Sequence, residues 1–180
     1  MFVNDINPVL LKLGIFEIRY YGLVYVLGFL LVYFVLSSYR KNGKLELSEN
    51  ELDKYVFYLM LGIVVGARLF HVFLWDFKYY MNNLLDIFKF WEGGMAFYGG
   101  LSGAIFVTYI FFKKKKISFL RVADMVVIPA ALMLALGRVA NFLNGELVGI
   151  VTNVSWCVKF KFSEGCRHPV QLYEAFGRFF

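Results

Sequence analysis

Long apolar stretches alternate with short polar ones along the chain. A bilayer core about 30 Å thick requires about 20 predominantly apolar residues per helix. Four stretches approach that length: residues 20–39, 55–75, 95–112 and 122–143. A fifth begins at Val170, and the sequence ends within it at Phe180. The pattern therefore predicts an all-α integral membrane protein. We expect a polytopic helical bundle of about four complete transmembrane helices and the start of a fifth, in a single membrane domain over residues 1–180.

Basic residues determine the predicted orientation. The chain carries 19 Lys and Arg against 13 Asp and Glu. Lys and Arg are concentrated between helices one and two and between helices three and four: Arg40, Lys41, Lys44, Lys54, Lys113, Lys114, Lys115, Lys116 and Arg121. Short loops rich in Lys and Arg remain cytoplasmic, so the N-terminus is predicted to lie outside. This placement beside helix ends argues against nucleic acid as a partner, and the acidic N-terminal segment argues against a secretory signal peptide.

The polar stretches carry structural signals of their own. Ser48 followed by Glu51 is a capping box and predicts the start of the second helix. In residues 77–92, apolar side chains recur at three- and four-residue spacing, which predicts an amphipathic helix in the outer membrane interface. Residues 144–169 form the longest polar segment, an outer loop. Apolar residues within it favour a short strand or hairpin: Val151, Val154, Trp156, Val158 and Phe160.

The two cysteines, Cys157 and Cys166, both fall in this outer loop. An oxidising compartment permits a disulfide there, and two unpaired thiols are equally compatible with the sequence. Two Cys and a distant His do not supply the four ligands of a closed zinc site. We therefore expect neither a metal nor a soluble cofactor.

Polar residues near the helix ends gather on the predicted outer side. Independent structural needs would not all place polar groups on one side, so we predict a functional site there. The residues concerned are Arg19, Tyr21, Arg68, His71, Glu92, Tyr98, Arg138, Asn141, Asn144, Glu146, Arg167, His168, Gln171, Tyr173 and Glu174.

Arg68 and Arg138 lie one to two turns inside the predicted outer boundary. An Arg in a membrane helix costs at least about 2.5–3.5 kcal/mol on insertion scales. One interpretation is structural: the side chains snorkel or pair, for instance Arg68 with Glu92. The other is that both guanidinium groups line a polar cavity and bind a phosphate, which matches their planar fork of donors. Asn141 and Asn144 extend a polar stripe from Arg138 along one helix face.

Glycine pairs surround the predicted start of the third helix, at Gly93-Gly94 and Gly99-Gly100. Glycine lets a backbone approach a ligand or another helix closely, and a helix N-terminus attracts anions. Tight packing of membrane helices through small residues explains the same pattern, so this stretch alone does not separate the two roles. After the fourth helix, Asn144-Gly145-Glu146 predicts a sharp chain reversal.

Five blocks together resemble the prolipoprotein diacylglyceryl transferase family, in the family's order and spacing over essentially the whole chain. The first two are Arg19-Tyr20-Tyr21-Gly22-Leu23 and Gly66-Ala67-Arg68-Leu69. The others span residues 91–101, 137–149 and 167–174, and the block at 137–149 is long and specific.

The resemblance implies an enzyme that moves the diacylglyceryl group of phosphatidylglycerol to the thiol of a lipobox cysteine in a prolipoprotein, releasing glycerol phosphate. It implies as partners phosphatidylglycerol, prolipoprotein signal peptides and membrane lipid, at the outer face of a bacterial-type cytoplasmic membrane. The catalytic positions expected from the resemblance and the residues are Tyr21, Tyr98, Arg138, Asn141 and Glu146. The expected phosphatidylglycerol-binding positions are Arg68, Gly99, Gly100, Arg138, Asn144, Gly149 and Arg167.

Roles follow from the chemistry of that transfer. We expect Arg138, helped by Asn141 and Arg68, to bind the leaving phosphate, where charge develops in the transition state. Glu146 is expected to orient an arginine rather than to act as the base.

The proton acceptor is open at this stage. Tyr98 stands where many family members have a histidine that is a candidate base, and a phenol with an ordinary pKa near 10 is a poorer base at neutral pH. His71, His168 and water are the alternatives. His168, which is followed by Pro169, also fits a structural start to the last helix.

The family has about seven helices, and its last helix carries a Tyr, an Arg and a Glu that face the active site. This sequence ends within the equivalent of the fifth helix, so we expect a C-terminally truncated chain that is weakly active or inactive alone. The competing hypotheses are a degenerate homologue and a non-catalytic, transporter-like protein that binds anionic lipid in the same basic cavity. The sequence shows no internal repeat, which argues against a transporter. The oligomeric state is left open.

Overall fold

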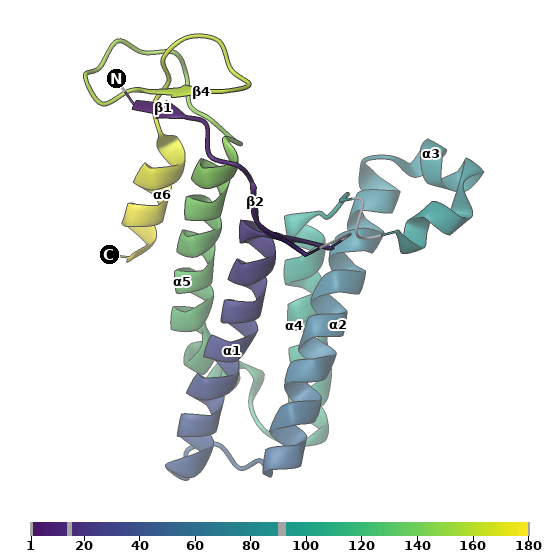
Figure 1. The fold of residues 1–180 in the computed structure, drawn as a ribbon. Coiled ribbons are helices and arrows are strands. Elements are labelled where there is room, and N and C mark those ends of the chain that lie inside the picture. Colours follow the sequence, from purple (N-terminus) through teal and green to yellow (C-terminus); the bar gives the residue numbers. More distant parts are fainter. Residues whose placement is uncertain (1, 14–15, 90–92, 180) are drawn as a thin grey trace. The chain divides into compact units, whose positions relative to one another are not determined.

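The computed structural model describes residues 2–13, 16–89 and 93–179, and its helices follow the predicted apolar stretches (Figure 1). The predicted class, a helical polytopic membrane protein, is confirmed. The long helices are α1 (Tyr20–Lys41), α2 (Glu49–Leu74), α4 (Phe97–Lys114) and α5 (Phe119–Asn144), and the shorter α6 spans Val170–Phe179. Helix α2 begins earlier than its apolar stretch because Ser48 and Glu51 cap it reciprocally, as the capping box predicted.

Three helices in the described part of the chain are long and apolar enough to cross a membrane: α1, α2 and α5. Helix α4 has 18 residues and ends in two lysines. At 1.5 Å per residue it is about 27 Å long, close to the thickness of a bilayer core. Its crossing of the membrane remains a prediction.

The chain forms two compact units. The terminal unit consists of residues 1–32 and 126–180, and the central unit consists of residues 33–125. The boundaries fall within α1 and α5.

The central unit is built on α2 and α4, which run side by side (Figure 1). Their contact is a backbone-to-backbone approach through glycines: a Cβ on Gly66 would collide with the carbonyl of Gly99, and a Cβ on Gly103 would collide with that of Gly62. Small residues permit such close packing of membrane helices. Tyr55 and Thr108, both buried, join the same two helices by a hydrogen bond of 3.0 Å.

The segment predicted as one amphipathic helix over residues 77–92 is divided in the structure. Helix α3 spans Phe77–Asn82 and a 3₁₀ helix, η1, spans Leu84–Phe88. The side-chain amides of Asn82 and Asn83 donate to the carbonyls of Lys78 and Tyr79 at 3.0 Å each, in competition with the backbone, and this ends α3. Residues 90–92 of the predicted helix lie outside the described residues, and its place in the membrane interface stays a prediction.

The terminal unit adds short strands to the helices. Strand β1 (Phe2–Asn4) pairs in parallel with β4 (Val158–Phe160), and β2 (Val9–Leu13) pairs in antiparallel with β3 (Phe16–Arg19). The strand predicted within residues 144–169 is therefore present as β4. Its partner is the N-terminal β1 rather than the neighbouring half of a hairpin (Figure 1).

A disulfide joins Cys157 to Cys166, whose Cα atoms lie 5.5 Å apart, and this decides between the two states that the sequence left open. Around it, Arg167 forms isolated bridges with both Val151 and Val158. Arg167 thus lies between Val151 and Val158 in a small sheet-like loop, and the disulfide closes this loop.

We predict that replacing both Cys157 and Cys166 by Ser lowers the free energy of unfolding by about 2.5 kcal/mol, because the short cross-link restricts the unfolded chain. Thermal unfolding in lipid micelles measures the loss. Mass analysis after alkylation should show no maleimide on the untreated protein and two after reduction. Two labels before reduction would contradict the bond.

Candidate functional site

The end of α5 places Glu146 by a defined helix stop. Gly145 has φ of 71°, a conformation that favours glycine. Its N–H donates to the carbonyl of Phe142 at 3.0 Å, and the Glu146 N–H donates to the carbonyl of Asn141 at 2.9 Å. This pair of bonds is a Schellman motif, which satisfies carbonyls that a helix end otherwise leaves open. The sharp reversal predicted from Asn144-Gly145-Glu146 is therefore present.

Glu146 is the centre of a group of polar contacts. The Tyr21 hydroxyl donates to its Oε2 at 3.3 Å, and the Asn144 amide donates to its Oε1 at 3.3 Å. The buried side chain of Gln171 donates to the Glu146 backbone carbonyl at 2.6 Å. Three elements, α1, α5 and α6, therefore converge on one carboxylate-bearing residue.

Arg138 lies two turns before the end of α5 and is paired through one edge of its guanidinium. Its Nε lies 2.7 Å from Oε2 of Glu174 on α6. The same oxygen lies 3.2 Å from an Nη of Arg178. The Arg138 side chain is 28 % exposed, so the group is partly shielded from the surroundings and yet accessible. One carboxylate therefore holds Arg138 in place through Nε.

Gly149 and Arg167 belong to the small sheet of the loop. The Gly149 N–H donates to the carbonyl of His168 at 3.1 Å, and its own carbonyl accepts from Nη1 of Arg167 at 3.0 Å. A Cβ on Gly149 would lie 2.6 Å from the His168 carbonyl, which explains a glycine there. An open hollow of about 560 Å³ borders these residues, lined by Val148, Gly149, Ile150, Arg167, His168, Val170 and Tyr173.

His168 lies in a hydrogen-bonded chain with two aromatic residues. The indole N–H of Trp156 donates to the hydroxyl of Tyr173 at 2.7 Å, and Nδ1 of His168 lies 3.2 Å from that same hydroxyl. The His168 backbone also pairs with Ile150 and Gly149 just before α6 begins. These contacts agree with a structural start to the last helix.

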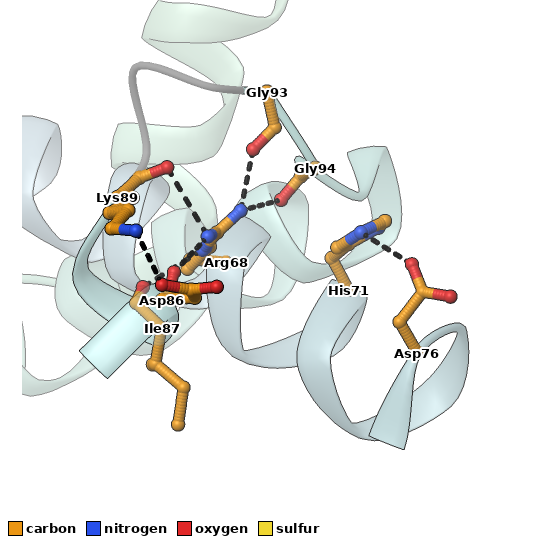
Figure 2. A network of polar contacts seen from close by, with 8 residues as sticks. All are labelled: Arg68, His71, Asp76, Asp86, Ile87, Lys89, Gly93 and Gly94. Atoms are coloured by element: carbon orange, nitrogen blue, oxygen red, sulfur yellow. Dashed lines mark hydrogen bonds and ion pairs between the residues drawn. The ribbon is translucent and has the colours of Figure 1, made fainter. Parts of the chain in front are cut away.

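In the central unit, Arg68 is buried and points into the loop between α3 and α4 (Figure 2). Among the described residues, the Arg68 side chain donates hydrogen bonds only to backbone carbonyls. These belong to Asp86, Ile87, Lys89, Gly93 and Gly94. The suggested partner Glu92 lies outside the described residues. The geometry favours a structural role for Arg68 over phosphate binding.

The carboxylate of Asp86 contacts Lys89 and Tyr79. Lys89 Nζ lies 2.6 Å from Oδ1, and the Tyr79 hydroxyl donates to Oδ2 at 2.6 Å. These bonds, led by the one from Lys89, hold the pKa of the Asp86 carboxyl below its ordinary value. Nearby, His71 Nε2 lies 3.1 Å from an Asp76 carboxylate oxygen (Figure 2).

The remaining predicted residues of the central unit lie at the start of α4. Gly99 and Gly100 are buried against α2, where they serve helix packing. Tyr98 is 68 % exposed. Its backbone carbonyl accepts a bond from Ser102 at 2.8 Å.

The structure thus brings together, within the terminal unit, one group of the predicted residues: Tyr21, Asn141, Asn144 and Glu146 around the end of α5. From the sequence, Gln171 and Glu174 were predicted only to be outer polar residues. The structure gives Gln171 a bond to Glu146 and gives Glu174 the ion pair with Arg138. In the sequence, the four-residue spacing between Glu174 and Arg178 was a sign that the Glu174 carboxylate takes part in an ion pair.

Comparison with known proteins identifies the family of the chain. The family model "Prolipoprotein diacylglyceryl transferase" matches residues 8–180. The chain is 41 % identical over 177 residues to the phosphatidylglycerol–prolipoprotein diacylglyceryl transferase of Rickettsia canadensis (strain McKiel), covering 98 % of this chain and 68 % of that protein. It is 42 % identical over 171 residues to the protein of the same name from Geobacter sulfurreducens, covering 94 % of this chain and 66 % of that protein.

The chain belongs to the prolipoprotein diacylglyceryl transferase family. It spans about two thirds of the length of these curated relatives.

We predict that Gly145→Ala lowers the free energy of unfolding by about 1–2 kcal/mol, because an L-residue is strained at a positive φ. Thermal unfolding in lipid micelles measures the change. Gly177→Ala is the matched control, since a Cβ on Gly177 meets open space and Ala favours the helix. Equal unfolding temperatures for the Gly145 variant and the parent protein would contradict the assigned role.

Proposed function

We propose that this protein transfers the diacylglyceryl group of phosphatidylglycerol to the thiol of a prolipoprotein cysteine. In the transfer, sulfur forms a bond to the terminal glyceryl carbon, and the bond between that carbon and the phosphate oxygen breaks. Glycerol phosphate leaves with the electron pair, and the thiol proton passes to a base. The observation that carries the proposal is Arg138, held by Glu174, in a chain of this family.

Arg138 is suited to the leaving phosphate by the way it is paired. Glu174 engages Nε, and the terminal Nη groups form the edge that binds two phosphate oxygens in parallel. A guanidinium held in advance stabilises charge as it develops, without reorganisation during the reaction. Asn141 is buried one turn further along α5. It lies on the same helix face as Arg138 and is proposed to help it bind the phosphate.

Glu146 serves as an orienting carboxylate. Donors from Tyr21 and Asn144 occupy its two oxygens, which suits a residue that positions others better than a free base. Gly149 and Arg167 border the neighbouring hollow and are proposed to contact the lipid headgroup. Tyr98, at the family's histidine position, is proposed to lie near the reacting thiol.

The membrane location follows from the helices, and we infer the finer placement from charge. Basic residues end α1 and α4, at Arg40, Lys41, Lys113 and Lys114, and such ends remain cytoplasmic. The disulfide lies in the loop that follows α5. A disulfide requires an oxidising compartment, which agrees with an outer location. The site residues therefore face the outer side of a bacterial-type cytoplasmic membrane, where exported signal peptides arrive.

We also infer that α3 and η1 lie in the outer interface. Leu85 and Phe88 are 80 % and 67 % exposed, whereas Tyr80 is buried against the unit. Exposed apolar side chains on a short helical segment suit the boundary between headgroups and acyl chains. No observation on the described residues favours the non-catalytic alternative.

We predict that Arg138→Ala lowers the rate of diacylglyceryl transfer by about 10²–10³-fold, as loss of a transition-state donor does elsewhere. The assay supplies phosphatidylglycerol vesicles and a lipobox peptide, and mass analysis measures the thioether-linked product. Glu174→Gln should cause a smaller loss, because Arg138 keeps its charge and loses its anchor. Arg40→Ala, on the opposite end of α1, is the control. An Arg138→Ala rate equal to that of the parent protein would contradict the role proposed for Arg138.

We predict the orientation from single cysteines placed in a Cys157→Ser, Cys166→Ser background. Asn153→Cys, in the exposed loop, should react with a membrane-impermeant maleimide in intact cells. Asn42→Cys, after the basic end of α1, should react only after lysis. The reverse pattern would invert the proposed topology.

A further inference from the structure

The guanidinium of Arg68 has no donor left for a ligand. An arginine has five N–H donors, and the loop supplies five carbonyl acceptors. Nε donates to Ile87 at 2.9 Å, Nη1 donates to Gly93 at 2.5 Å and Gly94 at 3.1 Å, and Nη2 donates to Asp86 at 2.5 Å and Lys89 at 3.3 Å. Figure 2 shows Arg68 with Asp86, Ile87 and Lys89 of one segment and Gly93 and Gly94 of the next.

The charge of Arg68 is met by peptide dipoles and an aromatic face. Its guanidinium carbon lies 5.1 Å from the ring centroid of Tyr80 on α3, a cation–π contact. Among the described residues, no carboxylate forms an ion pair with it, because Asp86 is bonded to Lys89 and Tyr79. Arg68 therefore binds backbone carbonyls. This binding depends on the conformation of the loop and not on the identity of the loop's side chains.

The segment that Arg68 holds leads directly into α4. Gly93 and Gly94 have φ of 97° and 73°. Two residues later, the Ala96 N–H donates to the carbonyl of Ala67 at 3.0 Å, just before α4 begins. The start of α4 is thus attached to α2 at two adjacent residues, Ala67 and Arg68.

Gly94 is part of this arrangement. A Cβ there would lie 2.7 Å from Nη1 of Arg68 and 2.7 Å from the His71 ring. A side chain at residue 94 would therefore displace the guanidinium without changing any charge. Arg68 and Gly94 can be perturbed separately to break the same contact.

We infer that Arg68 is a positioning residue that holds the backbone of residues 86–89 and 93–94 and thereby sets where α4 begins and where Tyr98 stands. The inference rests on the proposed function for its catalytic consequence, and it assigns no phosphate to Arg68. A lysine cannot replace the arginine, because one ammonium with three donors cannot reach five carbonyls spread around the edges of a planar guanidinium.

The test compares Arg68→Lys, Gly94→Ala and the double variant of the whole protein in phosphatidylglycerol vesicles. Each single variant should lower kcat for transfer to the lipobox peptide by roughly 10- to 100-fold. KM for phosphatidylglycerol should change less than about twofold, since the lipid contact is untouched. The double variant should lose less than the product of the single losses, because both break one contact. Arg40→Lys and Gly177→Ala are the matched controls and should retain the parent activity.

Hydrogen exchange of the amides in residues 86–89 and 93–96 provides a readout independent of turnover. Both variants should lose protection there while the middle of α2 stays protected. A raised KM for phosphatidylglycerol in Arg68→Lys, with normal kinetics in Gly94→Ala, would instead show a phosphate contact and overturn the inference. Unchanged exchange and unchanged kcat in Gly94→Ala would overturn it as well. If the parent protein makes no product, the proposed function gains no support, and the exchange data alone decide whether Arg68 holds the start of α4.

Discussion

The absence of water in the hydrocarbon layer is the constraint on which this structure depends. A polar group placed there has to find its partner within the chain. Arg68 satisfies this requirement by donating to five backbone carbonyls, and Tyr55 satisfies it by a hydrogen bond with Thr108. At the end of α5, the N–H groups of Gly145 and Glu146 donate to the carbonyls of Phe142 and Asn141. The polar residues near helix ends are therefore structural anchors first, and any chemistry is built on those anchors.

Two arginines that look equivalent in the sequence differ in their surroundings. Arg68 is buried with every donor engaged, so it stabilises a loop. Arg138 is held through Nε by a carboxylate and is partly exposed, so its remaining edge suits an anionic ligand. Residue type alone did not distinguish them, because the acceptors of Arg68 are main-chain atoms. A saturated and a half-engaged guanidinium are therefore proposed to have different roles.

The long helices were predictable because their apolar stretches exceed what a soluble domain tolerates, and the capping box and the Asn144-Gly145 turn were predictable because those signals are local. The break at Asn83 was missed because two amides outweigh an otherwise regular apolar spacing. The pairing of Glu174 with Arg138 and of β1 with β4 was missed because both join segments that are distant in sequence. The carbonyl partners of Arg68 were missed because a main-chain acceptor leaves no mark in the sequence.

The parallel pairing of β1 with β4 has a consequence for the order in which the protein assembles. Phe2 pairs with Val158, so the first strand is made long before its partner exists. At a synthesis rate of about 5–20 residues per second, β1 waits roughly 8–30 s before β4 leaves the ribosome. During that interval the N-terminal strand lacks its partner β4. Closure of this small sheet is therefore a late event in biogenesis, and a chaperone that shields the early strand would have its longest opportunity there.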